Sequence, residues 1–143
     1  QNLFNKLTAL WAAARLPGLL DSVDQAAVIE ETLARQRDDG GWSLFSLGPY
    51  QLREGSPRAT KSDGYATGMI AFVLLQTGAW PEQSGLKRAL AWLSANQDTA
   101  DGSWPAHSLN KHRDPSSDIG RFMRDAATAY AVLALTSGHQ EIK

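Results

Sequence analysis

The feature that most restricts the fold of this sequence is a short turn that occurs twice. Asp39-Gly40-Gly41-Trp42 recurs 62 residues later as Asp101-Gly102-Ser103-Trp104, and each copy follows a glutamine. Asp-Gly is a turn pair, because glycine accepts positive φ and aspartate bonds the backbone that follows it. The tryptophan can then cover the turn with its large apolar face. We predict a structural role, with each glutamine bonding backbone groups at a neighbouring helix end, for Gln36, Asp39, Gly40, Trp42, Gln97, Asp101, Gly102 and Trp104.

Apolar residues before the first turn recur at helical spacing. One stripe that includes Leu3 and Leu10 predicts a first helix, which ends before Pro17. A second helix is expected to begin at Ser22, where Gln25 three residues later forms a capping-box pattern. This helix is expected to end near Gln36, with Ile29 and Leu33 turned inward.

Three further helices are expected. One runs from Asp63 to Thr77 and is apolar nearly all round, which implies burial on several sides. The next starts near Ser84 and is amphipathic, and the last starts at Asp125 and is again apolar nearly all round. Amphipathic helices that alternate with wholly apolar ones suit two concentric layers. The sequence therefore predicts one all-α domain over residues 1–143, made of helical hairpin repeats.

Composition excludes several classes of protein. With 43% hydrophobic residues the chain can bury a core, and its net charge of -1 gives no general attraction to nucleic acid. The absence of cysteine excludes disulfides and thiol ligands for zinc. The most apolar run, residues 66–75, is far shorter than the roughly 20 residues of a membrane-spanning helix. Because the chain begins at Gln1, we expect a segment of a longer protein.

The second turn and the helix before it resemble a known repeat. Lys87-Arg88-Ala89-Leu90-Ala91-Trp92-Leu93, followed by Gln97 and the Asp101–Trp104 turn, is similar to the QW repeat of squalene–hopene cyclases, and the turn after Gln36 is a weaker copy. The resemblance covers the whole chain as about two and a half hairpins. It implies an arc of an α/α toroid with inner and outer helices, isoprenoid-type substrates, and a neighbour for the arc, either other copies or the rest of the polypeptide.

The chemistry of that family is only partly available here. The Asp-x-Asp-Asp acid of polyene cyclases is missing, since its nearest approach is Gln36-Arg37-Asp38-Asp39. The Asp/Cys/His zinc site of prenyltransferases cannot form without cysteine. The expected function is therefore part of a terpenoid-modifying enzyme without its catalytic acid in this segment. The alternative is a non-catalytic scaffold that binds a ligand or a protein through basic loops.

Two carboxylates and two histidines are further candidates. Asp63 and Asp125 lie 62 residues apart and could act as a catalytic pair, although an aspartate at a helix start more often caps it. Two histidines, His107 and His112, share a loop with Asp114 and Asp118, but this spacing fixes no metal geometry. We expect solvated loop residues here, with no metal and no cofactor.

The long connections, roughly residues 37–62 and 98–124, are where function is expected. Residues 43–62 and 105–124 each carry a net charge of +2, while the whole chain carries -1. Both loops should emerge at the same end of the hairpins and form a positive rim for an anionic ligand, either a small molecule such as a phosphate or a carboxylate, or an acidic partner. The rim residues are Arg53, Arg58, Lys61, Lys111, Arg113, Arg121 and Arg124.

Overall fold

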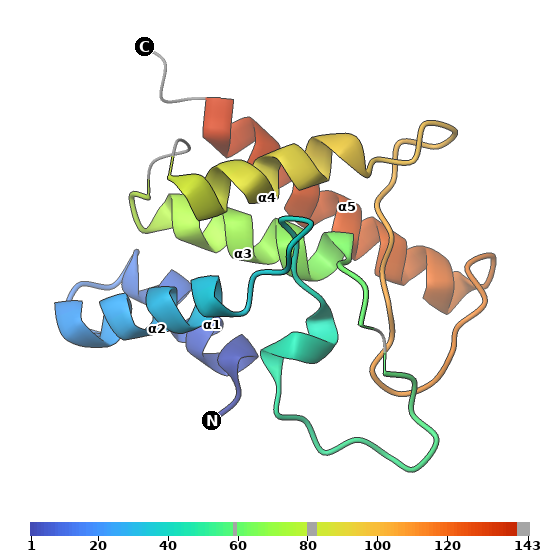
Figure 1. Cartoon of the computed structure of the whole chain (residues 1–143), viewed down its shortest axis with the longest axis horizontal. Coiled ribbons are helices and arrows are strands. Elements are labelled where there is room, and N and C mark those ends of the chain that lie inside the picture. Colours follow the sequence, from blue (N-terminus) through green and yellow to red (C-terminus); the bar gives the residue numbers. More distant parts are fainter. Residues whose placement is uncertain (59, 80–82, 140–143) are drawn as a thin grey trace.

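A computed structural model describes residues 1–58, 60–79 and 83–139 (Figure 1). Within these ranges the chain is all-helical and has no strand, which confirms the predicted all-α class. The elements are α1 (Leu3–Ala13), α2 (Ser22–Ala34), the 3-10 helix η1 (Leu44–Leu47), α3 (Gly64–Gln76), α4 (Ser84–Ala95) and α5 (Asp118–His139). No helix in the described ranges is both long enough and apolar enough to cross a membrane.

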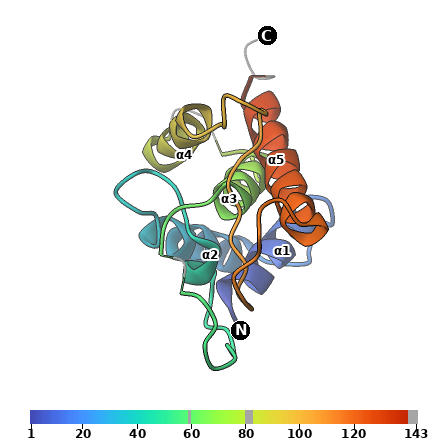
Figure 2. The same cartoon turned by 90° about the vertical axis from the view of Figure 1, so that its right-hand side faces the viewer.

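The central element is α3, which is in contact with α1, α4, α5 and η1 (Figure 2). It carries no charged residue, and eleven of its thirteen residues are buried. Gly68 lies where α3 crosses α5, since a β-carbon there would come within 2.7 Å of the backbone nitrogen of Ala131. The prediction of an apolar helix buried on several sides is therefore confirmed for α3.

The first hairpin is more exposed than expected. Asp21, not Ser22, caps α2 by accepting a hydrogen bond from the Asp24 N–H, and the side chain of Gln25 donates to the Leu20 carbonyl instead of completing a capping box. The residue of α2 that is fully buried is Thr32. Leu33, expected to point inward, is 36% exposed, because it lies at the edge of the contact with α4.

The last helix begins at Asp118, seven residues before the predicted Asp125. The hydroxyl of Ser117 accepts a hydrogen bond from the Gly120 N–H at 3.1 Å, which is the bond of an N-cap serine. The residues that this adds, 118–124, form the first two turns of the helix, where the sequence predicts loop. Nor is α5 buried all round: Ala127, Ala131 and Ala134 are buried, whereas a second face is exposed, including Ile119, Phe122, Val132 and Leu133.

The two Asp-Gly-x-Trp turns make the same hydrogen bonds. The side-chain amide of Gln36 donates to the Gly40 carbonyl at 2.8 Å, and that of Gln97 donates to the Gly102 carbonyl at 2.9 Å. Gly40 and Gly102 both have positive φ, 93° and 75°. In each turn the aspartate accepts from the backbone N–H two residues later. The predicted turn is thus present at both places.

The two tryptophans fix each turn to the helices beside it. The indole N–H of Trp42 donates to the carbonyl of Thr32 in α2, and that of Trp104 donates to the carbonyl of Leu93 in α4, both at 2.8 Å. Both rings are buried, at 0% and 2% exposed. The backbone N–H groups of the same tryptophans donate to the hydroxyls of Thr67 in α3 and Thr128 in α5.

Candidate functional site

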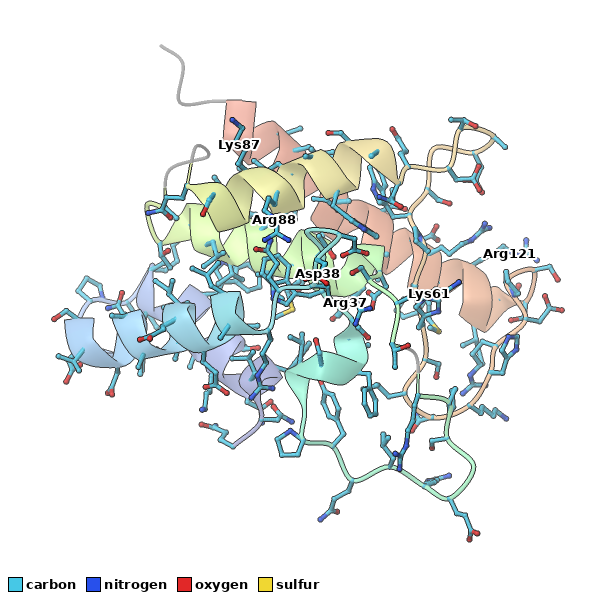
Figure 3. The ribbon with its side chains drawn as sticks, in the orientation of Figure 1. Arg37, Asp38, Lys61, Lys87, Arg88 and Arg121 are labelled. Atoms are coloured by element: carbon cyan, nitrogen blue, oxygen red, sulfur yellow. The ribbon has the colours of Figure 1, made fainter. Side chains whose placement is uncertain are left out.

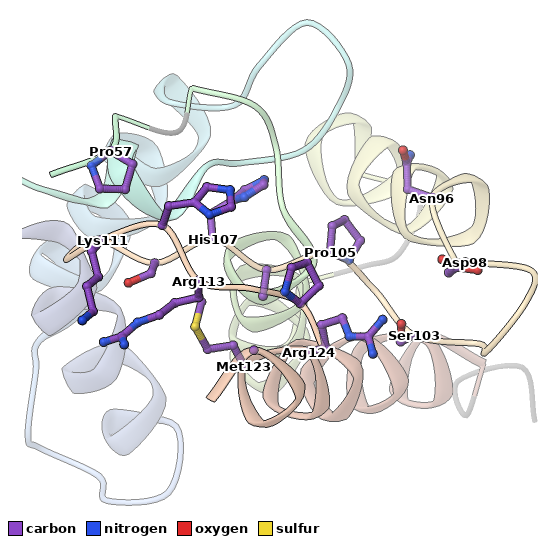
Figure 4. A pocket seen from close by; sticks show the side chains of 15 residues that line it. Pro57, Asn96, Asp98, Ser103, Pro105, His107, Lys111, Arg113, Met123 and Arg124 are labelled. Atoms are coloured by element: carbon purple, nitrogen blue, oxygen red, sulfur yellow. The ribbon is translucent and has the colours of Figure 1, made fainter. Parts of the chain in front are cut away.

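The two long loops lie at the same end of the molecule, as predicted. The hydroxyl of Ser56, in the first loop, donates to the carbonyl of Asn110, in the second, at 3.0 Å. Next to this contact, at Pro57 and Lys111, is a cavity of about 680 Å³ (Figure 4). Its walls come from the second loop, from the first turns of α5 and, at Pro57, from the first loop. Its volume lies within the range of small-molecule sites, about 300–1,000 Å³, which makes the cavity a candidate ligand site.

Cationic and apolar side chains share the lining. Lys111, Arg113 and Arg124 supply three positive charges against the single carboxylate of Asp98. In Figure 4 the amino group of Lys111 and the guanidinium of Arg113 point to the same end of the cavity. The other charged or ionisable lining groups are the imidazoles of two histidines, and the apolar part is built by Pro57, Pro105, Ala106, Pro115 and Met123.

Within the described ranges, two guanidinium groups of the lining residues each have one N–H group without a hydrogen-bond acceptor. The Nε atoms of Arg113 and Arg124 are buried and have no hydrogen-bond partner among the described residues. Arg124 still forms an ion pair through Nη1 with Asp101 at 3.0 Å. Hydrogen bonds from Ser103, together with that arginine, lower the pKa of the Asp101 carboxyl below its ordinary value. The turn therefore holds Arg124 at the cavity wall.

The histidines lie in different surroundings. His107 is half-buried and close enough to Asp63 to favour the ionised form of that carboxylate. His112 is exposed and has the same effect on Asp114, whose pKa is lowered chiefly by hydrogen bonds from Ser116. In the described part of the chain no three histidine, aspartate or glutamate side chains come together as a metal would require.

The remaining predicted rim cations do not line this cavity. Arg53 and Lys61 are exposed, and Arg121 is paired with Asp118 at 3.5 Å (Figure 3). Arg58 lines a separate hollow of about 560 Å³ with Arg35 and Tyr50. Burial raises the pKa of Tyr50 to about 12. The expected single rim is therefore divided between a cavity, a second hollow and open surface.

The two candidate carboxylates are far from equivalent. Asp63 is fully buried and caps α3: one oxygen accepts from the Ala66 N–H at 2.8 Å, and the other accepts from the Leu44 N–H at 2.7 Å. Burial raises the pKa of its carboxyl, although the two N–H groups favour the ionised form. Asp125 is exposed in the third turn of α5 and does not cap the helix, so its predicted position at a helix start is wrong.

The hydrogen bonds of the tryptophans explain this difference. They align Thr67 with Thr128, an offset of 61 residues, whereas the pairing of Asp63 with Asp125 assumed 62. In the structural register Asp63 corresponds to Arg124, a cavity residue. Sequence reasoning missed Met123 and Pro57 as lining residues, because the first two turns of α5 are expected to be loop and the contact between the two loops has no sequence signal.

A comparison with protein-family models, with curated proteins and with solved structures finds no match for this chain. The cavity and the two turns are therefore the features of the molecule that bear on its function.

Proposed function

We propose that this domain binds an anionic small molecule in the cavity between its two long loops. The observation that carries the proposal is the charge of the cavity lining, where the three cations Lys111, Arg113 and Arg124 outnumber the single carboxylate of Asp98. A carboxylate or phosphate group would pair with these cations, and a guanidinium can bind such a group through two parallel hydrogen bonds.

The apolar part of the lining limits the ligand further. Proline rings, Ala106 and Met123 offer no hydrogen bonds, so they suit a hydrocarbon body better than a sugar or a nucleotide base. An anionic headgroup on a short apolar chain matches both parts of the lining. An isoprenoid phosphate or carboxylate is one member of this class.

A second proposal concerns the architecture around the cavity. The equal hydrogen bonds of the two turns, at Gln36–Trp42 and Gln97–Trp104, support an arc of helical hairpins of the squalene–hopene cyclase type. On this proposal the chain supplies wall and rim to a terpenoid-modifying enzyme. Asp63 would serve as a cap and not as the acid, because both of its oxygens already accept backbone hydrogen bonds.

An arc also requires a neighbour, from another copy or from elsewhere in the polypeptide. The exposed apolar side chains of α5, such as Phe122 at 72% and Leu133 at 43%, support that requirement. Sedimentation equilibrium over a wide concentration range tests for the first kind of neighbour. A closed oligomer would support completion by copies, and an ideal monomer at every concentration would exclude it.

The binding proposal is tested by titrating the protein with octyl phosphate, inorganic phosphate and octanol, using calorimetry. We expect octyl phosphate to bind more tightly than inorganic phosphate, and octanol not to bind. The double variant Lys111→Ala/Arg113→Ala should weaken octyl phosphate binding at least tenfold, the effect of about 1.4 kcal/mol.

The matched control is Arg53→Ala/Lys61→Ala, which removes the same charge from two exposed positions outside the cavity. Its affinity should equal that of the unmodified protein. Equal weakening in both double variants would mean that only general charge attraction operates, and the cavity proposal would be wrong.

A further inference from the structure

The first of the two turns, from Gln36 to Trp42, is covered by α4. Specific hydrogen bonds join this turn to the helix. The side-chain amide of Gln36 donates to the carbonyl of Gly85, in the first turn of α4, at 2.7 Å. One turn further on, Arg88 donates through Nη2 to the carbonyls of Arg37 and Asp38 at 2.7 and 3.0 Å (Figure 3). Three residues of the turn are thus held by two residues of the helix.

Two further contacts complete this cover. The indole N–H of Trp92, one turn after Arg88, donates to the carboxylate of Asp39 at 3.3 Å. Gly40 lies directly against the helix, since a β-carbon there would come within 2.8 Å of the Arg88 carbonyl oxygen. The helix that covers the turn therefore needs a small residue in its first turn, an arginine three residues later and a tryptophan four residues after that, as at positions 85, 88 and 92.

The second turn presents the same groups without a cover. Gln97 makes its hydrogen bond within the turn, to Gly102, and no described residue outside the turn bonds its side chain. A β-carbon on Gly102 would contact only the side-chain amide of Gln97, at 3.6 Å. A β-carbon on Gly40, in contrast, would contact the backbone of α4. Asp101 is exposed, and its carboxylate, which already accepts from Ser103 and Arg124, has room for another donor.

Charge favours the same kind of cover. Asp98 and Asp101 give the exposed turn two negative side chains, and α4 carries Lys87 and Arg88 with no acidic residue. An apolar cover without cations would leave the carboxylate of Asp101 and the amide of Gln97 with fewer partners than water gives them. A basic amphipathic helix matches the turn in the way that α4 matches the first turn.

We propose that the exposed turn Gln97–Trp104 is a docking site for the first turns of an amphipathic helix of the α4 type, with glycine, arginine and tryptophan spaced as Gly85, Arg88 and Trp92. In the complex, the carbonyl of that glycine would accept a hydrogen bond from the side-chain amide of Gln97. The arginine would donate to backbone carbonyls of the turn, and the indole N–H of the tryptophan would donate to the carboxylate of Asp101. This surface lies outside the ligand cavity except at Asp98 and Ser103, so the proposal stands independently of anion binding.

The experiment uses a synthetic peptide with the sequence of residues 83–96. A peptide of this length is only marginally helical in water, so a hydrocarbon staple joins the exposed positions 87 and 91. Binding to the whole chain is followed by chemical shift changes in the protein. We expect saturable changes at the Gly102 N–H and the Gln97 side-chain amide. Peptides with Arg88→Ala or Trp92→Ala should bind at least tenfold more weakly.

Two protein variants make the test specific. Gln97→Ala removes an exposed side chain with one bond inside its own turn, so the fold should survive while peptide affinity falls about three- to tenfold. Gln36→Ala is the matched variant at the covered turn and should leave peptide affinity unchanged. Loss of binding in Gln36→Ala instead would mean that the peptide displaces α4, and the proposal would be overturned. No binding by any variant, or a second copy of the chain seated on this turn, would also overturn it.

Discussion

The two Asp-Gly-x-Trp turns share their sequence and their internal hydrogen bonds but differ in what covers them. The first, from Gln36 to Trp42, lies under α4, and Gly40 and Gly41 are buried. In the second, from Gln97 to Trp104, the tryptophan is buried, but Gly102 and Ser103 are only half-buried and Gln97 is exposed, whereas Gln36 is half-buried. The aspartate before each glycine is exposed in both turns. A short sequence therefore sets the shape of the turn, and its burial depends on whether a helix with the right donors lies over it.

The largest expected effect is one that the two turns should share. Trp42→Ala and Trp104→Ala each remove a buried ring and its indole hydrogen bond, so each should lower the free energy of unfolding by about 3–5 kcal/mol. Urea denaturation followed by circular dichroism measures both. A cost below about 1 kcal/mol for Trp104→Ala alone would mean that the exposed turn is not anchored as the structure indicates.

The glycines should separate the two turns. Both have positive φ, so an alanine at either position should cost about 1–2 kcal/mol in backbone strain. Gly40→Ala also forces a methyl group against the Arg88 carbonyl and should cost about 1–3 kcal/mol more. The same denaturation experiment compares Gly40→Ala with Gly102→Ala. Equal losses of unfolding free energy in the two variants would show that α4 does not pack closely against Gly40.

The glutamines should separate the turns by a smaller amount. Gln36→Ala removes two half-buried hydrogen bonds, one of them to Gly85 in α4, and should cost about 1–3 kcal/mol. Gln97→Ala removes one exposed bond and should change stability by no more than about 0.5 kcal/mol. Thermal melts of the two variants check this order, and the reverse order would contradict it.

The smallest effect concerns pH. Desolvation opposes ionisation of Asp39, but hydrogen bonds from Gly41, Ser62 and Trp92 outweigh it and hold the pKa of this carboxyl below its ordinary value of 3.8. A lowered folded pKa contributes stability above the unfolded pKa, and that contribution is lost as the pH falls through the folded value. Asp39→Asn should therefore cost less than about 1 kcal/mol at pH 7, and less still below pH 3.8. Urea midpoints at pH 7 and at acidic pH measure this cost. A cost that rises on acidification would contradict the claim that the ionised carboxylate of Asp39 stabilises the turn.

Sequence reasoning worked where a local pattern decides the structure. The turns, the all-α class and the bounds of α3 follow from turn chemistry and from a run of apolar residues with Asp63 before it. It failed at the start of α5, because the apparent 62-residue repeat pointed to Asp125 while the cap at Ser117 comes earlier. Reliance on the repeat therefore assigned two helical turns, residues 118–124, to the loop.

The candidate site was predicted only in part. Charge counting found Lys111, Arg113 and Arg124, but it could not separate them from Arg53, Lys61 and the other loop cations, since the fold of a loop decides which side chains face a cavity. The rim cations are divided between separate surfaces, and this division depends on the contact between Ser56 and Asn110. These two residues lie 54 positions apart, and no sequence pattern predicts that they meet.

Amide hydrogen exchange at the two turns tests the central claim most directly. The Gly40 and Gly102 N–H groups each donate a hydrogen bond within their own turn, to the carbonyl of Arg37 three residues back at 2.9 Å and to that of Asp98 four residues back at 2.8 Å, so we attribute a large difference in protection to the cover. The account predicts slow exchange at Gly40, fast exchange at Gly102, and slower exchange at Gly102 when the stapled peptide is added. Equal protection of the two amides in the free protein would contradict it.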